Sequence, residues 1–172
     1  METSEFIVRW TARLVVFAYV LRLLYDLQIW PWPKIRSDRT NRIMRNVWIA
    51  AAFIYLIHIA AAFQFVHHWS HAAAYEHTAQ QTARITGWHW GGGVWINYLI
   101  ALWWPLDLLL ICRKGIDKLP RWYVRIMHAS LGFIIFNATV VFGPKWWIVL
   151  GLILLVYLAV MRLRQSHNKD QI

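Results

Sequence analysis

Five segments of this chain are apolar enough to cross a lipid bilayer, and this feature constrains the fold more than any other. A membrane-spanning helix needs about 20 mostly apolar residues. The segments cover residues 6–30, 47–66, 94–112, 122–142 and 146–161. Segments of this length satisfy their backbone hydrogen bonds in lipid as helices. We therefore expect an all-α integral membrane bundle of about five transmembrane helices, built as a single polytopic domain over residues 1–172.

The composition supports this class and excludes others. The chain is 59% hydrophobic and contains 13 tryptophans, several of which flank the apolar segments as an interfacial aromatic belt does. A single cysteine, Cys112, excludes an internal disulfide framework and a cysteine-rich metal site. The acidic first residues and the lack of a small-residue cleavage site predict no cleavable signal peptide. The net charge of +10 lies mostly at the ends of the apolar segments, so we expect the lipid bilayer as partner and no nucleic acid.

The positive charges also predict an orientation. Lysine and arginine collect in short cytoplasmic loops. In this chain they collect after the first and third apolar segments and in the C-terminal tail: Lys34, Arg36, Arg39, Arg42, Arg45, Arg113, Lys114, Lys118, Arg121, Arg125, Arg162, Arg164 and Lys169. With five spans these regions share one side. We expect the C-terminus in the cytoplasm, and the N-terminus and the loop of residues 67–93 outside a bacterial inner membrane.

This outer loop is rich in histidine. It contains His67, His68, His71, His77 and His89, which are five of the eight histidines in the chain. Neutral imidazole is a common ligand of transition metals and haem, and it titrates near physiological pH. The loop therefore predicts a metal site, a cofactor site or a proton path at the outer membrane boundary.

The spacing of these histidines favours a metal site if the segment is helical. The second span either continues as one helix past residue 66 or restarts at Ser70 as a second helix near the surface. In a helical register Gln64, His67, His71, Tyr75, Thr78 and Thr82 share one face. His67 and His71, four residues apart, can then bind one ion, and His68 with His71 forms a second pairing. Glu76 and His77 lie on other faces of an ideal helix, so they would serve a different site unless the helix bends.

Polar residues within the spans form two further groups. Arg13, His58, Asn97 and Asn137 fall in the outer halves, where they predict a polar floor beneath the histidine loop, or else interhelical hydrogen bonds. Arg22, Asp26, Asp107, Arg125 and His128 fall toward the cytoplasmic side. There we expect salt bridges, with Arg22 paired to Asp26 and with Asp107 near Arg22 or Arg125.

Two resemblances accompany these patterns. The strings HHWSHAAAYEHTAQQT, GWHWGGG and FNATVVFG together resemble an uncharacterised group of small polytopic bacterial inner-membrane proteins. This resemblance implies a multi-pass bacterial membrane protein and lends no activity or site residue. The HHxxH string superficially resembles one histidine box of the membrane di-iron desaturases. Those enzymes carry three boxes on the cytoplasmic side, which disfavours di-iron chemistry here.

These observations lead to one preferred function and two alternatives. We expect an iron, copper or zinc ion, or haem b, bound at the outer face for electron transfer or metal handling. The predicted ligands are His67, His71 and either His68 or His89, with His58 as a deeper cofactor ligand and Glu76 and His77 as further candidates. The first alternative is a non-catalytic structural or assembly subunit of a larger membrane complex or homo-oligomer. A small proton-coupled transporter ranks last, because no inverted repeat is visible.

Overall fold

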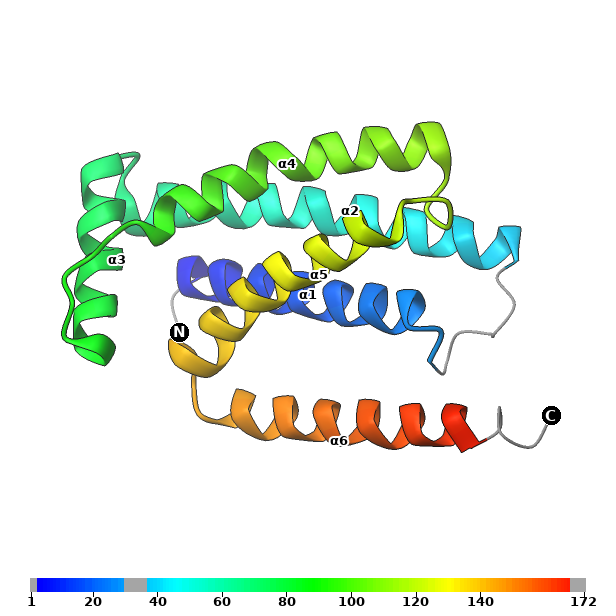
Figure 1. Ribbon diagram of the computed structural model, residues 1–172. Coiled ribbons are helices and arrows are strands. Elements are labelled where there is room, and N and C mark those ends of the chain that lie inside the picture. Colours follow the sequence, from blue (N-terminus) through cyan, green and yellow to red (C-terminus); the bar gives the residue numbers. More distant parts are fainter. Residues whose placement is uncertain (1–2, 30–36, 168–172) are drawn as a thin grey trace.

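The protein is a bundle of helices, which the computed structural model describes over residues 3–29 and 37–167 (Figure 1). The elements in these ranges are α1 (Thr3–Asp26), α2 (Asp38–Ala62), η1 (Phe63–His67), α3 (His71–Thr86), α4 (Gly93–Lys114), α5 (Arg121–Phe136), η2 (Asn137–Val141) and α6 (Trp146–His167). The segments η1 and η2 are single π-helical turns that extend α2 and α5. No strand occurs in the described ranges, which confirms the predicted all-α class.

Four helical stretches in the described part of the chain are long and apolar enough to cross a membrane. They are Asp38–His67, Gly93–Lys114, Arg121–Val141 and Trp146–Arg164, and they overlap the second to fifth predicted spans. The helix α1 has 24 residues but does not belong to this group. Its sequence is interrupted by charged side chains such as Arg9, Arg13 and Arg22. The predicted span at residues 6–30, and with it the total of five spans, therefore stays a prediction.

The helix ends differ from the predicted spans where polar residues continue a helix. The helix α2 begins nine residues before the predicted span, because Ser37 and Thr40 form a reciprocal capping box at its start. The helix α1 ends at Asp26, and Gln28 beyond it has a left-handed backbone with φ 54°. Lys34, Arg36 and Lys169, which entered the orientation prediction, lie outside the described residues.

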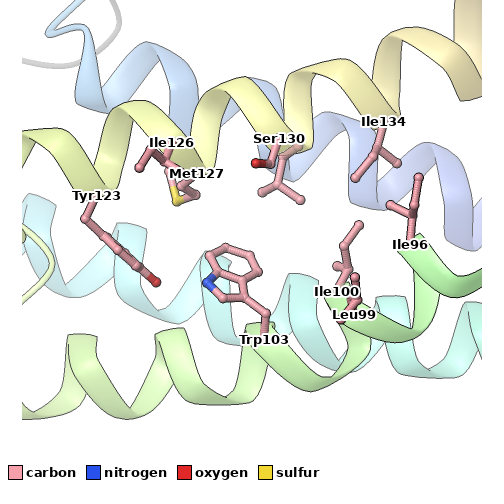
Figure 2. A pocket seen from close by; sticks show the side chains of 10 residues that line it. Ile96, Leu99, Ile100, Trp103, Tyr123, Ile126, Met127, Ser130 and Ile134 are labelled. Carbon is pink, nitrogen blue, oxygen red and sulfur yellow. The ribbon is translucent and has the colours of Figure 1, made fainter.

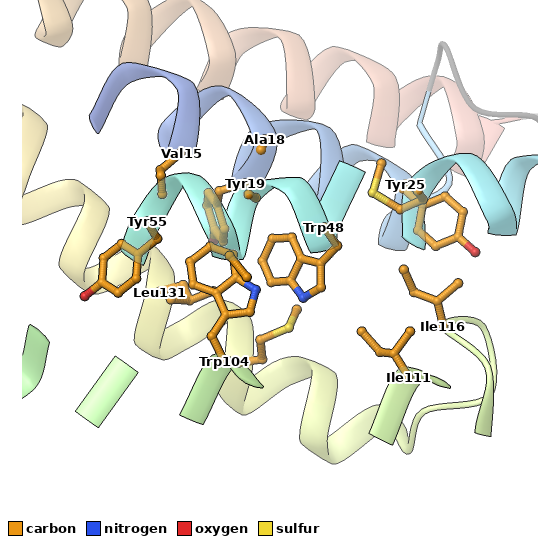
Figure 3. Packing of buried hydrophobic residues seen from close by; sticks show 14 of the residues in the cluster. Val15, Ala18, Tyr19, Tyr25, Trp48, Tyr55, Trp104, Ile111, Ile116 and Leu131 are labelled. Carbon is orange, nitrogen blue, oxygen red and sulfur yellow. The ribbon is translucent and has the colours of Figure 1, made fainter. Parts of the chain in front are cut away.

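The core is a layer of aromatic and small side chains between α1, α2 and α4 (Figure 3). The ring of Trp104 lies 4.6 Å from that of Trp48 and 5.5 Å from that of Tyr55, measured between centroids. Ala18 on α1 and Ala51 and Ala52 on α2 are buried beside these rings. Small residues let membrane helices approach closely, so these alanines bring α1 against α2.

The two ends of the bundle differ in structure. The helix α3 lies across one end, next to the start of α1 and the connection between α5 and α6 (Figure 1). The end of α1, the start of α2 and the connection between α4 and α5 lie at the opposite end. The described basic residues of the connections, such as Arg39 and Lys118, belong to this second end. We call the first end the α3 end and the second the basic end.

The helix α6 lies apart from the core. None of the residues in its most apolar stretch is buried, and most of its large apolar side chains, including Leu152, Leu155 and Val156, are exposed. A helix that is apolar all round is suited to lipid or to another protein. Its contact with the bundle is mainly to η2.

Candidate functional site

The histidine-rich segment is two elements separated by a sharp turn. His68 and Trp69 both have left-handed backbones, with φ 49° and 58°. The helix α3 then begins at His71, with the Ser70 hydroxyl accepting a hydrogen bond from the Ala73 amide. Of the two arrangements predicted, the restart at Ser70 is the one found. A single helical stripe through His67 and His71 is therefore wrong, because two left-handed residues rotate α3 away from the direction of η1.

The turn creates a different set of pairs. The rings of His67 and His77 lie 5.4 Å apart between centroids, in an edge-to-face contact. His71 instead contacts α4, where its Nδ1 lies 3.0 Å from the Tyr98 hydroxyl. Of the two alternatives predicted for His77, a different site or a bend in the helix, the bend is the one found, and it brings His77 to His67.

Glu76 and His89 form a second pair on the exposed surface. His89 Nε2 lies 3.2 Å from Glu76 Oε1. The Gln80 amide also donates a hydrogen bond to Glu76, and together with His89 it holds the pKa of this carboxyl below its usual value. His68 and His89 are both exposed and take no part in the pair of His67 with His77.

The predicted ligands do not gather around one point. Within residues 3–29 and 37–167, no group of three or more histidine, cysteine, aspartate or glutamate side chains is arranged to hold a metal ion. His58 lies deeper, with Nδ1 3.1 Å from the Val8 carbonyl oxygen and 3.1 Å from the Thr11 hydroxyl. The carbonyl accepts, so Nδ1 carries the proton and Nε2 keeps its lone pair.

A large open cavity lies at the α3 end of the bundle. Its volume is about 960 Å³, and its walls come from α1, α2, α3, α4, α5, η2 and α6. The four residues predicted as a polar floor, Arg13, His58, Asn97 and Asn137, all line it. Thr78 and Thr82 of α3 line it as well, so the C-terminal part of the predicted polar stripe does face this cavity.

The cavity has an electrostatic bias. The described residues that line it include Arg9 and Arg13 but no aspartate or glutamate. Arg9 has a partner outside the cavity, the exposed Glu5, at 3.3 Å. In the described part of the chain, Arg13 has neither a carboxylate partner nor a hydrogen bond. The cavity therefore contains a cation, Arg13, whose charge no carboxylate of the described residues neutralises.

Two indole rings hold Arg13 in place. Its Cζ lies 4.9 Å from the Trp10 ring centroid and 5.4 Å from that of Trp146. Stacking on aromatic faces leaves the edge of the planar guanidinium free, and this edge is suited to bidentate contact with phosphate or carboxylate. Arg13 is thus an oriented and unpaired donor at the wall of the cavity.

The amide side chains add neutral polar groups. Asn137 donates to the Phe133 carbonyl at 2.7 Å, which leaves its amide oxygen available. Asn97 is exposed, and its side chain makes no hydrogen bond in the described part of the chain. Both residues lie on helices opposite α1, so Arg13 and these amides border the cavity from different sides.

Glycines allow α3 to approach α4 beside the cavity. A Cβ atom on Gly91 would clash with the carbonyl oxygen and ring of Tyr75 on α3. A Cβ on Gly92 would clash with the ring of Trp90. Both glycines are buried. The absence of a Cβ at Gly91 therefore permits the close approach of α3.

The polar cluster at the basic end is buried and only partly bonded, since Arg22 Nη1 and Nη2 and His128 Nδ1 have no hydrogen-bond partner in the described part of the chain. Arg22 is fully buried, and its Nε donates to Asp26 Oδ2 at 2.6 Å as predicted. Asp26 Oδ2 also lies 3.1 Å from His128 Nε2. Asp107, equally buried, accepts hydrogen bonds from Trp48 Nε1 at 2.7 Å and the Tyr123 hydroxyl at 2.6 Å.

This cluster corrects one expectation. Asp107 makes an ion pair with neither Arg22 nor Arg125 in the described structure, and Arg125 is exposed. The sequence signal for its true partners was weak, since tryptophan and tyrosine are also common core and interface residues. His58 and His128 lie beside Val8 and Asp26, which are about 27 Å apart along α1. They do not share a cofactor.

No protein-family model, curated protein or solved structure matches this chain. The resemblance to small polytopic inner-membrane proteins therefore stays a prediction, and the functional argument depends on the geometry alone.

Proposed function

We propose that this protein binds an anionic ligand in the cavity at the α3 end. The observation that carries the proposal is Arg13, a half-buried cation oriented by Trp10 and Trp146 at the wall of a cavity without acidic side chains. A charge at membrane depth is costly and is normally paired or functional. A phosphate or carboxylate group would supply the missing partner.

The neighbouring polar groups would complete the recognition of such a ligand. The Asn97 amide can donate to an anionic oxygen, and the Asn137 amide oxygen can accept from a ligand hydroxyl. His58 Nε2 can accept a hydrogen bond from the ligand, or donate to an anion once protonated. This combination favours a headgroup with both anionic and hydroxyl functions over a bare inorganic ion.

The proposal includes the predicted membrane topology. We place the protein in a bacterial inner membrane with α1 as the fifth span, the α3 end outside and the C-terminus in the cytoplasm. The gathering of basic residues at the opposite end supports this orientation. The burial of Arg22 beside Asp26 supports α1 as a span, because this charge is paired within the bundle.

Ligand-induced stabilisation tests the proposal. A ligand that binds only the folded state raises its unfolding temperature. We expect dihexanoyl phosphatidic acid to raise the unfolding temperature of the detergent-purified protein, and dihexanoyl phosphatidylcholine, which has the same tails, to raise it less. Equal shifts would show that the headgroup charge is not recognised.

The contact between His67 and His77 favours a second candidate function, metal binding. Two imidazoles that bind one ion at about 2.1 Å and at a near-tetrahedral angle have ring centroids roughly 5 Å apart. The observed 5.4 Å fits this arrangement. We therefore retain an iron, copper or zinc site for metal handling or electron transfer, now with His67 and His77 as ligands and with water or a partner completing the shell. The edge-to-face contact leaves no space for haem b between the two rings.

The exposure of α6 favours the structural alternative. None of the apolar side chains in its most apolar stretch is buried in the described part of the chain. A larger membrane complex or homo-oligomer would bury one side of this helix through van der Waals packing. This alternative is compatible with ligand binding, because α6 meets the cavity only near its start, at Trp147.

A further inference from the structure

A second hollow, between α4 and α5, bears on the nature of the anionic ligand. It has a volume of about 300 Å³ and is lined almost entirely by apolar side chains, among them Leu99, Trp103, Ile126 and Leu131 (Figure 2). Its polar members are Ser130 and Tyr123, and the Tyr123 hydroxyl is already bonded to Asp107. We call it the α4–α5 groove.

The groove adjoins the cavity that contains Arg13. Ile96 of α4 and Ile134 of α5 line both hollows and lie at the same end of the groove in Figure 2. Beyond these two residues toward the α3 end the lining becomes polar, with Asn97 and Asn137. The two hollows thus lie next to each other, one with a cationic and polar lining and the other with an apolar lining.

The groove is open along its side. Leu99 and Ile126 at its rim are 65% and 58% exposed. These residues belong to the helices that are apolar enough to lie in a membrane. A chain-like molecule can therefore enter sideways from the bilayer, without passing through water.

We propose that the ligand is an anionic lipid, with its headgroup at Arg13 and one hydrocarbon tail in the α4–α5 groove. The inference rests on the proposed function, since it assigns a tail to the same anionic ligand. The volume of the groove is compatible with a hydrocarbon tail. If a methylene group occupies about as much space as a water molecule, roughly 30 Å³, the groove holds about ten methylene groups. A soluble anion would leave the groove without an occupant, whereas a lipid uses both hollows.

A groove-filling substitution tests the tail without touching the headgroup site. Ser130→Phe adds a ring inside the groove, while Ala129→Phe adds the same ring at an exposed neighbouring position that lines neither hollow. Binding of hexanoyl and dodecanoyl lysophosphatidic acid is measured by isothermal titration in one detergent, for the wild type and both variants. We expect Ser130→Phe to weaken binding of the dodecanoyl ligand by at least about fivefold. We expect Ala129→Phe to leave binding of both ligands unchanged, and Ser130→Phe to weaken binding of the hexanoyl ligand less than that of the dodecanoyl ligand.

The Arg13→Gln variant separates the two ways of failing. If Arg13→Gln weakens binding of both ligands but Ser130→Phe weakens neither, the anion site stands and the tail assignment is overturned. If Arg13→Gln affects neither ligand, the proposed function itself fails. Equal losses of affinity in Ser130→Phe and Ala129→Phe would show that the lipid only surrounds the helices and does not occupy the groove. This result would also overturn the inference.

Discussion

Asp107 and Trp48 are joined by a 2.7 Å hydrogen bond between α4 and α2, buried at the centre of the bundle. The same carboxylate accepts from the Tyr123 hydroxyl on α5 at 2.6 Å. One acidic side chain therefore connects three helices. This arrangement fixes the splay of α4 and α5, between which the groove lies.

Removal of the carboxylate should destabilise the bundle. Asp107→Ala leaves the Trp48 indole and the Tyr123 hydroxyl without their acceptor, and a hydrogen bond to a charged group contributes about 1.5–3 kcal/mol. Interhelical hydrogen bonds within membranes average lower, about 0.6 kcal/mol, so we expect a total loss of about 1–3 kcal/mol in unfolding free energy. Denaturant titration in detergent measures it. Asp117→Ala, in an exposed loop, is the matched control.

A double-mutant cycle isolates the bond itself. Trp48→Phe removes the donor and keeps most of the ring, so Asp107→Ala should cost less in the Trp48→Phe background than in the wild type. Losses that simply add would show that the contact contributes no energy of its own.

Close approach at Gly91 should also be measurable. Gly91→Ala places a methyl group against the Tyr75 carbonyl and ring, so α3 must shift from the mouth of the cavity. Overpacking of this kind costs about 1–3 kcal/mol. Gly151→Ala on α6 is the control, because a Cβ there meets nothing within 4 Å. Hydrogen exchange over residues 71–86 should accelerate in Gly91→Ala and not in Gly151→Ala; unchanged protection would mean that α3 is not held by this contact.

The proposed metal binding should depend on His67 and His77, a pair that the sequence did not single out. His67→Asn with His77→Asn should weaken Zn²⁺ binding by at least about tenfold, whereas His71→Asn with His89→Asn should not. Binding should also weaken as the pH falls, because protons compete for neutral imidazole. Isothermal titration with Zn²⁺ distinguishes the two double variants. A loss only in the second would restore His71 as a ligand.

The sequence predicted the parts of this structure that depend on composition. Apolar length located four of the helices, and depth along each span placed Arg13, His58, Asn97 and Asn137 at one level, where they line one cavity. It failed where a local backbone choice decides the geometry. The left-handed pair His68 and Trp69 breaks the predicted polar stripe through His67 and His71. Neither residue type is a strong predictor of such a turn.

The partners of Asp107 were unpredictable for a related reason. Charge complementarity favoured arginine, but a buried carboxylate is also satisfied by neutral donors. Trp48 and Tyr123 supply these donors, and no described arginine nitrogen lies within ion-pair distance of Asp107. The cavity itself arises from the relative placement of α1, α3, α4 and η2. No pattern within a single helix encodes that placement.

Binding of dihexanoyl phosphatidic acid to two arginine variants tests the central claim most directly. Arg13→Gln removes the unpaired cation of the cavity, whereas Arg84→Gln removes an exposed cation of α3 that does not line it. Isothermal titration should show that Arg13→Gln weakens binding by at least about fivefold, equivalent to about 1 kcal/mol, while Arg84→Gln binds as the wild type does. Equal affinity of the wild type and Arg13→Gln, or an equal loss in both variants, would contradict an anion site in this cavity.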